Sequence, residues 1–341
     1  SLWTLFWAWH SARSLREVLL PSFVWGLGYF AANTGWVYIS LHTHGGMPMA
    51  MALGAVFLLA SFLALFPMLA GWLTWRLPVS KLWRVALVAP TMLILLEWVR
   101  GWIFTGFPWA SIGIAQVDWL SGLYPLIGVY GVGWLLALCV ALSLVEKRLA
   151  LGFAFALISS SQLLSKVEWT QAVGKPLSVS ILQGNIQQSM KWNADFYLDS
   201  LASYLKLMQE AKGQLIILPE TAIPSFLSDV PAWYLDELRQ IAKQKNAEVL
   251  LGIATGDMAS GIYHNSVIHL RQPDVNQYAK SHLVPFGEYV PLPWLFGGIY
   301  QYLNMPLNGF TRAPLQQAPF TLAGGKIAAN VCYEDVFGDE I

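Results

Sequence analysis

Three segments in the second half of the chain each end an apolar run on a side chain that could do chemistry. The stretch "LIILPETAIP" places Glu220 just after apolar residues, "YAKSHLVPFGEYVP" places Lys280 after the strand-like residues 263–279, and "IAANVCYED" places Cys332 at the end of a third run. Catalytic groups favour the carboxyl ends of strands, where a rigid sheet directs them into a crevice. We therefore consider these three side chains together.

Glutamate, lysine and cysteine are sufficient for acyl transfer. A cysteine attacks as its thiolate, which a nearby base or cation must favour. Glu220 could take the proton, and Lys280 could stabilise the oxyanion of a tetrahedral intermediate. This chemistry requires no cofactor and no metal, and we expect neither. Each residue also has a structural interpretation, because a cysteine in an apolar strand is commonly core, and Glu and Lys are commonly solvated.

The composition predicts a protein that is at least partly in a membrane. Of the 341 residues, 56% are hydrophobic and only 12% are charged, whereas soluble domains carry roughly twice that charge. The formal net charge is zero, so nothing indicates nucleic acid as a partner. The two cysteines cannot build a disulfide framework, and neither belongs to a CxxC pair of the kind that binds structural zinc.

Residues 1–168 are expected to form a transmembrane helical domain. About five apolar runs are long enough to span a bilayer: 18–41, 49–75, 82–99, 121–145 and 149–164. Basic residues concentrate in cytoplasmic loops. One set of alternate loops holds seven of them, against Arg100 alone on the other side; the seven are Arg13, Arg16, Arg76, Lys81, Arg84, Lys147 and Arg148. An odd number of spans then places the rest of the chain on the face opposite the cytoplasm, which in a bacterium is the periplasmic face of the inner membrane.

Residues 175–341 are expected to form an α/β domain. Charged residues return here, and strand-like runs such as "PLSVSILQGN", "QLIILPE", "EVLLGIATG", "YHNSVIHL" and "KIAANVCYE" alternate with two amphipathic helices, "ADFYLDSLASYLKLMQEAKG" and "AWYLDELRQIAKQKNA". Such alternation is typical of a layered α/β fold.

Several motifs resemble those of a known family. The blocks "LPETAIP", "KSHLVPFGEYVP" and "NVCYEDVF" resemble the three catalytic blocks of the nitrilase, or carbon–nitrogen hydrolase, superfamily. Together with "EWVRGWIFTGFPW", "GVYGVGWL" and "GNIQQSMKW", they make the chain similar to the apolipoprotein N-acyltransferases, the membrane-embedded branch of that superfamily.

The resemblance implies an αββα sandwich that carries a Glu–Lys–Cys triad on a membrane bundle. Carried over by motif, Glu220 is the general base, Lys280 stabilises the oxyanion and Cys332 is the nucleophile. Glu288 and Glu334 match further acidic positions of the family, with a role in orienting the lysine or tuning the pocket.

The family reaction is a two-step, ping-pong acyl exchange. It implies a phospholipid as acyl donor, a cysteine thioester as intermediate and the N-terminal amine of a diacylglyceryl-cysteine apolipoprotein as acceptor, with the enzyme acting as a monomer. Family members also begin earlier and continue well past the cysteine block. We therefore expect N-terminal spans, the C-terminal part of the sandwich and a final span to be missing from this sequence.

Two features suggest contacts with lipid. Residues 289–310 are expected to form a long apolar loop inside the polar half, which is either ordinary packing or a lid that dips into the lipid surface through Trp294, Phe296, Tyr300 and Met305. Arg100 lies three residues after Glu97 at the end of an expected span. This pair either anchors the helix end, which we favour, or presents Arg100 to a phospholipid phosphate.

The remaining candidates have structural interpretations. His42 and His44 form an HxH pair, but no further ligands stand nearby, so we interpret them as loop residues rather than a metal site. Cys139 lies among leucine and alanine in an expected span and is interpreted as core.

Two other functions stay open at this point. One is a membrane-tethered amidase that hydrolyses a carbon–nitrogen bond with the same triad and with water as the final acceptor. The other is a non-catalytic scaffold that binds lipoprotein. The presence of Glu220, Lys280 and Cys332 together argues against the scaffold, because a degenerate site has no reason to keep all three.

Overall fold

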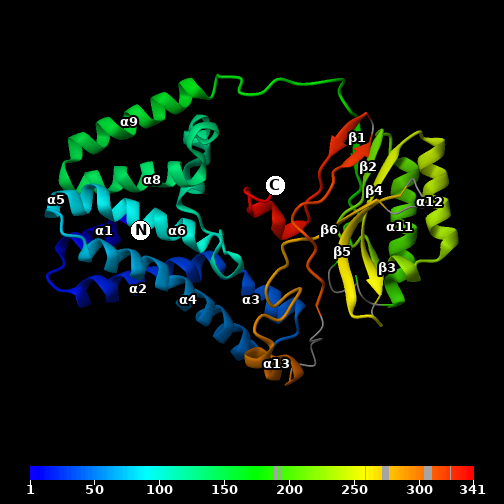
Figure 1. Ribbon diagram of the computed structural model, residues 1–341, viewed down its shortest axis with the longest axis horizontal. Coiled ribbons are helices and arrows are strands. Elements are labelled where there is room, and N and C mark those ends of the chain that lie inside the picture. Colours follow the sequence, from blue (N-terminus) through cyan, green and yellow to red (C-terminus); the bar gives the residue numbers. More distant parts are fainter. Residues whose placement is uncertain (188–190, 192–193, 258, 271–275, 303–308, 323) are drawn as a thin grey trace. The chain divides into compact units, whose positions relative to one another are not determined.

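A computed structural model of the chain divides into two compact units, residues 1–172 and 173–341 (Figure 1). The structure describes residues 1–341 except 188–190, 192–193, 258, 271–275, 303–308 and 323.

The first unit is helical. Its longer helices are α1 (Leu2–Ser11), α2 (Leu15–Thr34), α4 (Met49–Arg76), α6 (Ala89–Arg100), α8 (Tyr124–Val145) and α9 (Lys147–Leu164). The shorter elements are α3 (Val37–Ile39), η1 (Ser40–His44), α5 (Lys81–Trp83), η2 (Arg84–Val88), η3 (Ile103–Thr105), η4 (Ile112–Gln116), α7 (Val117–Leu120) and η5 (Ser121–Leu123).

Three helical stretches among the described residues are long and apolar enough to cross a membrane: Met49–Arg76, Lys81–Arg100 and Ile112–Val145. The expected run 18–41 is divided between α2, α3 and a π-helical turn, and the run 149–164 falls within α9. The count of five spans stays a prediction. The membrane-type helical unit itself agrees with the composition.

Small residues let α2 and α4 approach closely. A Cβ on Gly26 would stand 2.8 Å from Pro67 Cγ and 2.9 Å from Ala64 Cα, which no real Cβ tolerates. Close backbone contact through small side chains is how helices associate in lipid, where burial of apolar surface gives no net drive.

The second unit is built on a mixed sheet. Its strands are β1 (Val179–Ile181), β2 (Leu215–Ile217), β3 (Ile223–Phe226), β4 (Glu248–Asp257), β5 (Ile262–His269) and β6 (Gln277–Ala279). The order is β1-β2-β4-β5-β6, with β3 also paired to β4. β1, β2 and β4 run parallel, while β4, β5 and β6 are antiparallel. The predicted α/β fold of this unit is confirmed.

The two faces of this sheet are covered differently. Helices α11 (Tyr197–Glu210) and α12 (Ala232–Gln244) lie on one face, as Figure 1 shows, and pack on Ile216, Val249 and Leu251. The intervening residues Leu215 and Leu250 face a hairpin of β7 (Phe320–Leu322) and β8 (Gly325–Ile327). This alternation is the period of two that a strand buried on both faces requires.

Two local predictions were wrong. The run "KIAANVCYE" was expected to be one strand, but β8 ends at Ile327 and Cys332 begins a 3₁₀ helix, η8 (Cys332–Val336). The segment 289–310 was expected to be a loop, but it contains the helix α13 (Pro293–Tyr302). Apolar composition alone does not separate strand, helix and loop in short runs. The short helices η6 (Ala194–Phe196) and η7 (Leu227–Asp229) complete the described elements.

The backbone at Pro219 and Glu220, just after β2, approaches Gly252 in β4 very closely. A Cβ on Gly252 would lie 2.3 Å from the Pro219 carbonyl oxygen and 2.8 Å from Glu220 Cα. We predict that Gly252→Ala lowers the free energy of unfolding by about 1–3 kcal/mol, because the backbone at Glu220 must move. The measurement is the thermal midpoint of the purified protein. Gly338→Ala is the control, since a Cβ there meets nothing within 4 Å; equal midpoints for the two variants would contradict the prediction.

Candidate active site

Glu220 stands three residues beyond β2, in a turn that its neighbours fix. Leu218 N donates to the Leu250 carbonyl oxygen at 2.9 Å and Ala222 N to that of Gly252 at 2.9 Å, so both sides of the turn are bonded to β4. One carboxylate oxygen of Glu220 accepts a hydrogen bond of 2.5 Å from Asn265 Nδ2. The carboxylate is therefore held in one orientation.

Lys280 follows β6 directly and carries a buried charge. It is 1% exposed, and its Nζ donates to Glu288 Oε1 at 2.8 Å. An ammonium group out of water requires an anionic partner, because an unpaired buried charge costs several kcal/mol. Its backbone is fixed too, since Lys280 N donates to the Asn265 carbonyl oxygen and its own carbonyl oxygen accepts from Ala313 N. The sequence-predicted lysine is thus tightly positioned.

Glu288 and Asn265 join these two residues into one network. Glu288 accepts from Lys280 Nζ, from Asn265 Nδ2 at 3.3 Å and from Val284 N at 2.7 Å. The Asn265 amide, 2% exposed in β5, therefore donates to both Glu220 and Glu288. Sequence reasoning missed Asn265. The available signal was one amide side chain inside the apolar strand "YHNSVIHL".

Cys332, at the start of η8, interacts electrostatically with this network. It is an exposed residue, and its φ of 54° lies in the left-handed region that non-glycine residues seldom adopt. Partial burial of the thiol and then the Glu220 charge raise the pKa of Cys332, while Lys280 lowers it and Glu288 raises it. The thiol therefore lies within the electrostatic field of all three predicted partners.

Glu334 links the segment around Cys332 to the segment around Lys280 through hydrogen bonds. Its side chain accepts from Ser281 N (2.7 Å), Ser281 Oγ (2.8 Å), His282 N (3.1 Å), Tyr278 Oη (2.8 Å) and Val331 N (2.7 Å). Burial would raise the pKa of Glu334, but the backbone donors outweigh it and hold that pKa below its ordinary value. Its role is therefore to fix the spacing between the residues next to Lys280 and those next to Cys332.

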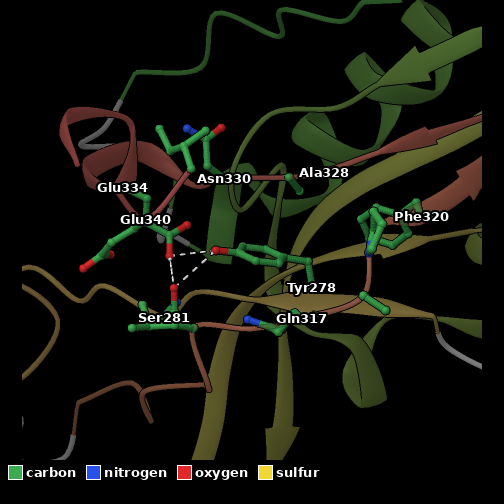
Figure 2. Close-up of a pocket in the computed structure, with 13 residues that line it drawn as sticks. Tyr278, Ser281, Gln317, Phe320, Ala328, Asn330, Glu334 and Glu340 are labelled. Atoms are coloured by element: carbon green, nitrogen blue, oxygen red, sulfur yellow. Dashed lines mark hydrogen bonds between the residues drawn. The ribbon is translucent and has the colours of Figure 1, made fainter. Parts of the chain in front are cut away.

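A pocket lies beside Glu334, but it is not formed by Glu220, Lys280 and Cys332. Figure 2 shows Glu334, Ser281 and Tyr278 along its wall, joined by hydrogen bonds. Its lining includes neither Glu220 nor Lys280 nor Cys332. The pocket is therefore separate from the Asn265 network, although Glu334 belongs to its lining.

The predicted lipid contacts differ in exposure. Trp294 is 80% exposed at the start of α13. Phe296 instead packs its ring edge-on against Phe286, with centroids 5.0 Å apart, and Tyr300 Oη donates to the Phe286 carbonyl oxygen at 2.5 Å. Phe296 and Tyr300 therefore hold α13 in place. Met305 lies outside the described residues.

Arg100 and Glu97 are both buried at the end of α6. The Arg100 guanidinium donates to the carbonyl oxygens of Phe107 and, at 2.6 Å, Trp109. Glu97 accepts from Ser111 Oγ at 2.7 Å. These contacts support the interpretation that the pair anchors the helix end and the loop after it. The contact between Arg100 and a lipid phosphate stays a prediction.

The other candidates behave as ordinary structural residues. His42 Nδ1 lies 2.8 Å from the Met47 carbonyl oxygen, and Cys139 is half-buried in α8. Within the part of the chain that the structure describes, no group of three or more His, Cys, Asp or Glu side chains could hold a metal ion.

Comparison with known proteins covers both units. Residues 1–142 match the family model "Apolipoprotein N-acyltransferase N-terminal domain", and residues 178–341 match "Carbon-nitrogen hydrolase". The apolipoprotein N-acyltransferases of Chromobacterium violaceum, Nitrosomonas europaea and Methylococcus capsulatus are 43%, 39% and 38% identical to the chain. The alignments cover 96%, 98% and 100% of this chain and 66%, 68% and 69% of those proteins. The chain thus spans about two thirds of the length of these curated relatives.

Replacing Glu334 tests whether its carboxylate holds the Cys332 and Lys280 segments together. We predict that Glu334→Ala lowers the free energy of unfolding by about 3 kcal/mol at pH 7, because buried donors lose their acceptor. Since its folded pKa is lowered from 4.5, the stabilisation is present above that value and is lost as the pH falls through the folded pKa. The measurement is thermal unfolding of both proteins from pH 7 down to pH 3.

The matched control is Asp335→Ala, which removes the exposed neighbouring carboxylate. An equal loss in both variants, or a difference between wild type and Glu334→Ala that persists unchanged at pH 3, would contradict the assigned role.

Proposed function

Because the chain belongs to the apolipoprotein N-acyltransferase family, we propose that it moves an acyl chain from a phospholipid, through a thioester on Cys332, to the N-terminal amine of a diacylglyceryl-cysteine apolipoprotein. The observation that carries the proposal is the network in which Asn265 joins Glu220 to Glu288 and Glu288 binds the buried Lys280. The amidase alternative is not favoured, because the relatives are acyltransferases along both units.

The first half-reaction forms the thioester. Since the pKa of the Cys332 thiol is raised, the resting residue is protonated at neutral pH and needs a proton acceptor. Glu220 takes that proton as the sulfur attacks the lipid ester carbonyl, and the Lys280 ammonium stabilises the oxyanion. When the carbon–oxygen bond breaks, Glu220 returns the proton to the leaving alkoxide of the lysophospholipid.

The second half-reaction consumes the thioester. The acceptor amine attacks the carbonyl carbon and gives its proton to Glu220, while Lys280 again stabilises the oxyanion. The carbon–sulfur bond then breaks, and the thiolate of Cys332 regains a proton from Glu220. Such a ping-pong sequence needs no cofactor and returns each group to its starting state.

The same proposal extends to placement. We assign residues 1–168 to the membrane domain and residues 175–341 to the catalytic domain. Three apolar helices support the membrane assignment. For a chain in a bacterial inner membrane, the excess of basic residues in alternate loops supports a catalytic domain on the periplasmic side. The proposal takes the enzyme to act as a monomer.

An exposed apolar ridge on α13 supports a lid that contacts lipid. Leu292 and Leu295 are exposed beside Trp294, while Phe296 and Tyr300 tie the helix to Phe286. Trp294 therefore presents a rigid amphipathic ring outward, as side chains at a membrane interface do. In this proposal, Trp294 contacts the lipid directly and the two inward rings fix its position.

The covalent intermediate gives the first test. We predict that intact mass measurement of the purified protein, incubated with phospholipid, shows an acyl adduct that hydroxylamine removes. The adduct should be absent in Cys332→Ala and present in Cys139→Ala, which removes the other cysteine. An adduct in Cys332→Ala would refute the assigned nucleophile. Rapid release of free fatty acid with an acceptor amine present would favour hydrolysis over transfer.

The lid gives a second test. We predict that Trp294→Glu slows acylation by phospholipid at least about fivefold but leaves the reaction with a water-soluble ester unchanged, because the charge opposes burial in lipid. Trp233→Glu, in α12, is the matched control, since Trp233 is also strongly exposed, at 61%. An equal loss on both substrates, or an equal loss in the Trp233 variant, would refute the lid.

A further inference from the structure

We propose that Lys191 is a positioning residue of this site: it fixes the backbone of Glu220 and supplies the second positive charge that balances the two carboxylates beside Cys332. The inference rests on the proposed role of Cys332 as nucleophile. It concerns a residue outside the Glu–Lys–Cys triad.

Lys191 contacts Glu220 directly. Its side chain is half-buried, and its Nζ donates to the Glu220 carbonyl oxygen at 3.0 Å. The acceptor is a neutral backbone carbonyl, which compensates the ammonium charge less than a carboxylate would. Among the described residues, no carboxylate forms an ion pair with Lys191. Its positive charge is therefore available to the site as a whole.

The charges around Cys332 balance only with Lys191 included. Glu220 and Glu288 are two acids, and Lys280 is one base that is already paired to Glu288. Glu334, on the segment of Cys332 itself, accepts from the Ser281 and His282 backbone and is not among the charges that act on the Cys332 thiol. The carboxylate of Glu220 receives a neutral donor, the amide of Asn265.

Lys191 is the cation that balances this remaining charge. Burial lowers the pKa of Lys191, and its interactions with Glu220 and Cys332 oppose that lowering. Asp335, the other acid on the cysteine segment, accepts from Asn330 Nδ2 at 3.3 Å. Together, Glu220, Glu288, Lys280 and Lys191 carry no net charge, whereas without Lys191 a thiolate at Cys332 would face the net negative charge of the other three.

The test follows the reactivity of Cys332 without any lipid. In a Cys139→Ala background, Cys332 is the single thiol, so its alkylation by iodoacetamide can be followed against pH by intact mass. Lys191→Met removes the charge and the hydrogen bond, Lys191→Gln removes the charge and keeps a donor, and Lys191→Arg keeps both. We expect the Met and Gln variants to be alkylated about 3- to 10-fold more slowly at pH 7.5, with the profile moved to higher pH. The Arg variant should follow the parent.

Lys245 provides the matched control. Its Nζ also donates to backbone carbonyl oxygens, those of Gln209 at 2.8 Å and Ala211 at 2.9 Å, but neither belongs to the site. Lys245→Met should leave the alkylation profile unchanged. A profile that shifts equally in the Lys245 variant would show that the effect is general destabilisation and would overturn the inference.

The remaining outcomes are decisive as well. If Lys191→Gln follows the parent while Lys191→Met is slow, the hydrogen bond alone matters and the charge role is overturned. If none of the Lys191 variants shifts the profile, the whole inference fails. Because alkylation uses no phospholipid, the expected shifts combined with no acyl adduct from phospholipid would retain Lys191 and refute the proposed acyl transfer.

Discussion

The buried carboxylate of Glu334 is the constraint on which the geometry of the site depends. It accepts hydrogen bonds from the backbone at Ser281 and His282 on one segment and at Val331 on another. Neither segment is held by a strand at that point: β6 ends at Ala279 and β8 at Ile327. A buried anion must be satisfied by donors in fixed directions, so it determines the distance between two loops that the sheet leaves free.

The ion pair between Lys280 and Glu288 adds a second constraint on the geometry of the site. The Lys280 ammonium is buried and would be strongly unfavourable without Glu288, and Asn265 connects that pair to Glu220. Each member thereby limits the rotamers of the next. A network of this kind pre-organises a site, because the charges that stabilise an oxyanion need no rearrangement when that charge appears.

The candidate reactive residues could be predicted from the sequence, but their hydrogen-bond partners could not. Glu220, Lys280 and Cys332 could be singled out because each follows an apolar run, and the motifs around them resemble one family. Asn265 could not, because its partners are set by the β4–β5 register, where Ala254 pairs with it, and register depends on tertiary contacts. The α/β fold was predictable from alternating runs, since strands and helices bury surface with different periods.

The strand that was predicted to continue to Cys332 ends at Ile327, and the reason is physical. An apolar run predicts burial but not hydrogen bonding, and here Val331 N is taken by the Glu334 carboxylate instead of a neighbouring strand. Leaving the sheet allows Cys332 to adopt a left-handed φ of 54° and to be exposed, although such backbone strain costs about 1–3 kcal/mol. An acyl chain is too bulky to reach a thiol inside a packed sheet. The bonds to Glu334 thus stabilise a strained turn that leaves Cys332 exposed while Lys280 stays buried.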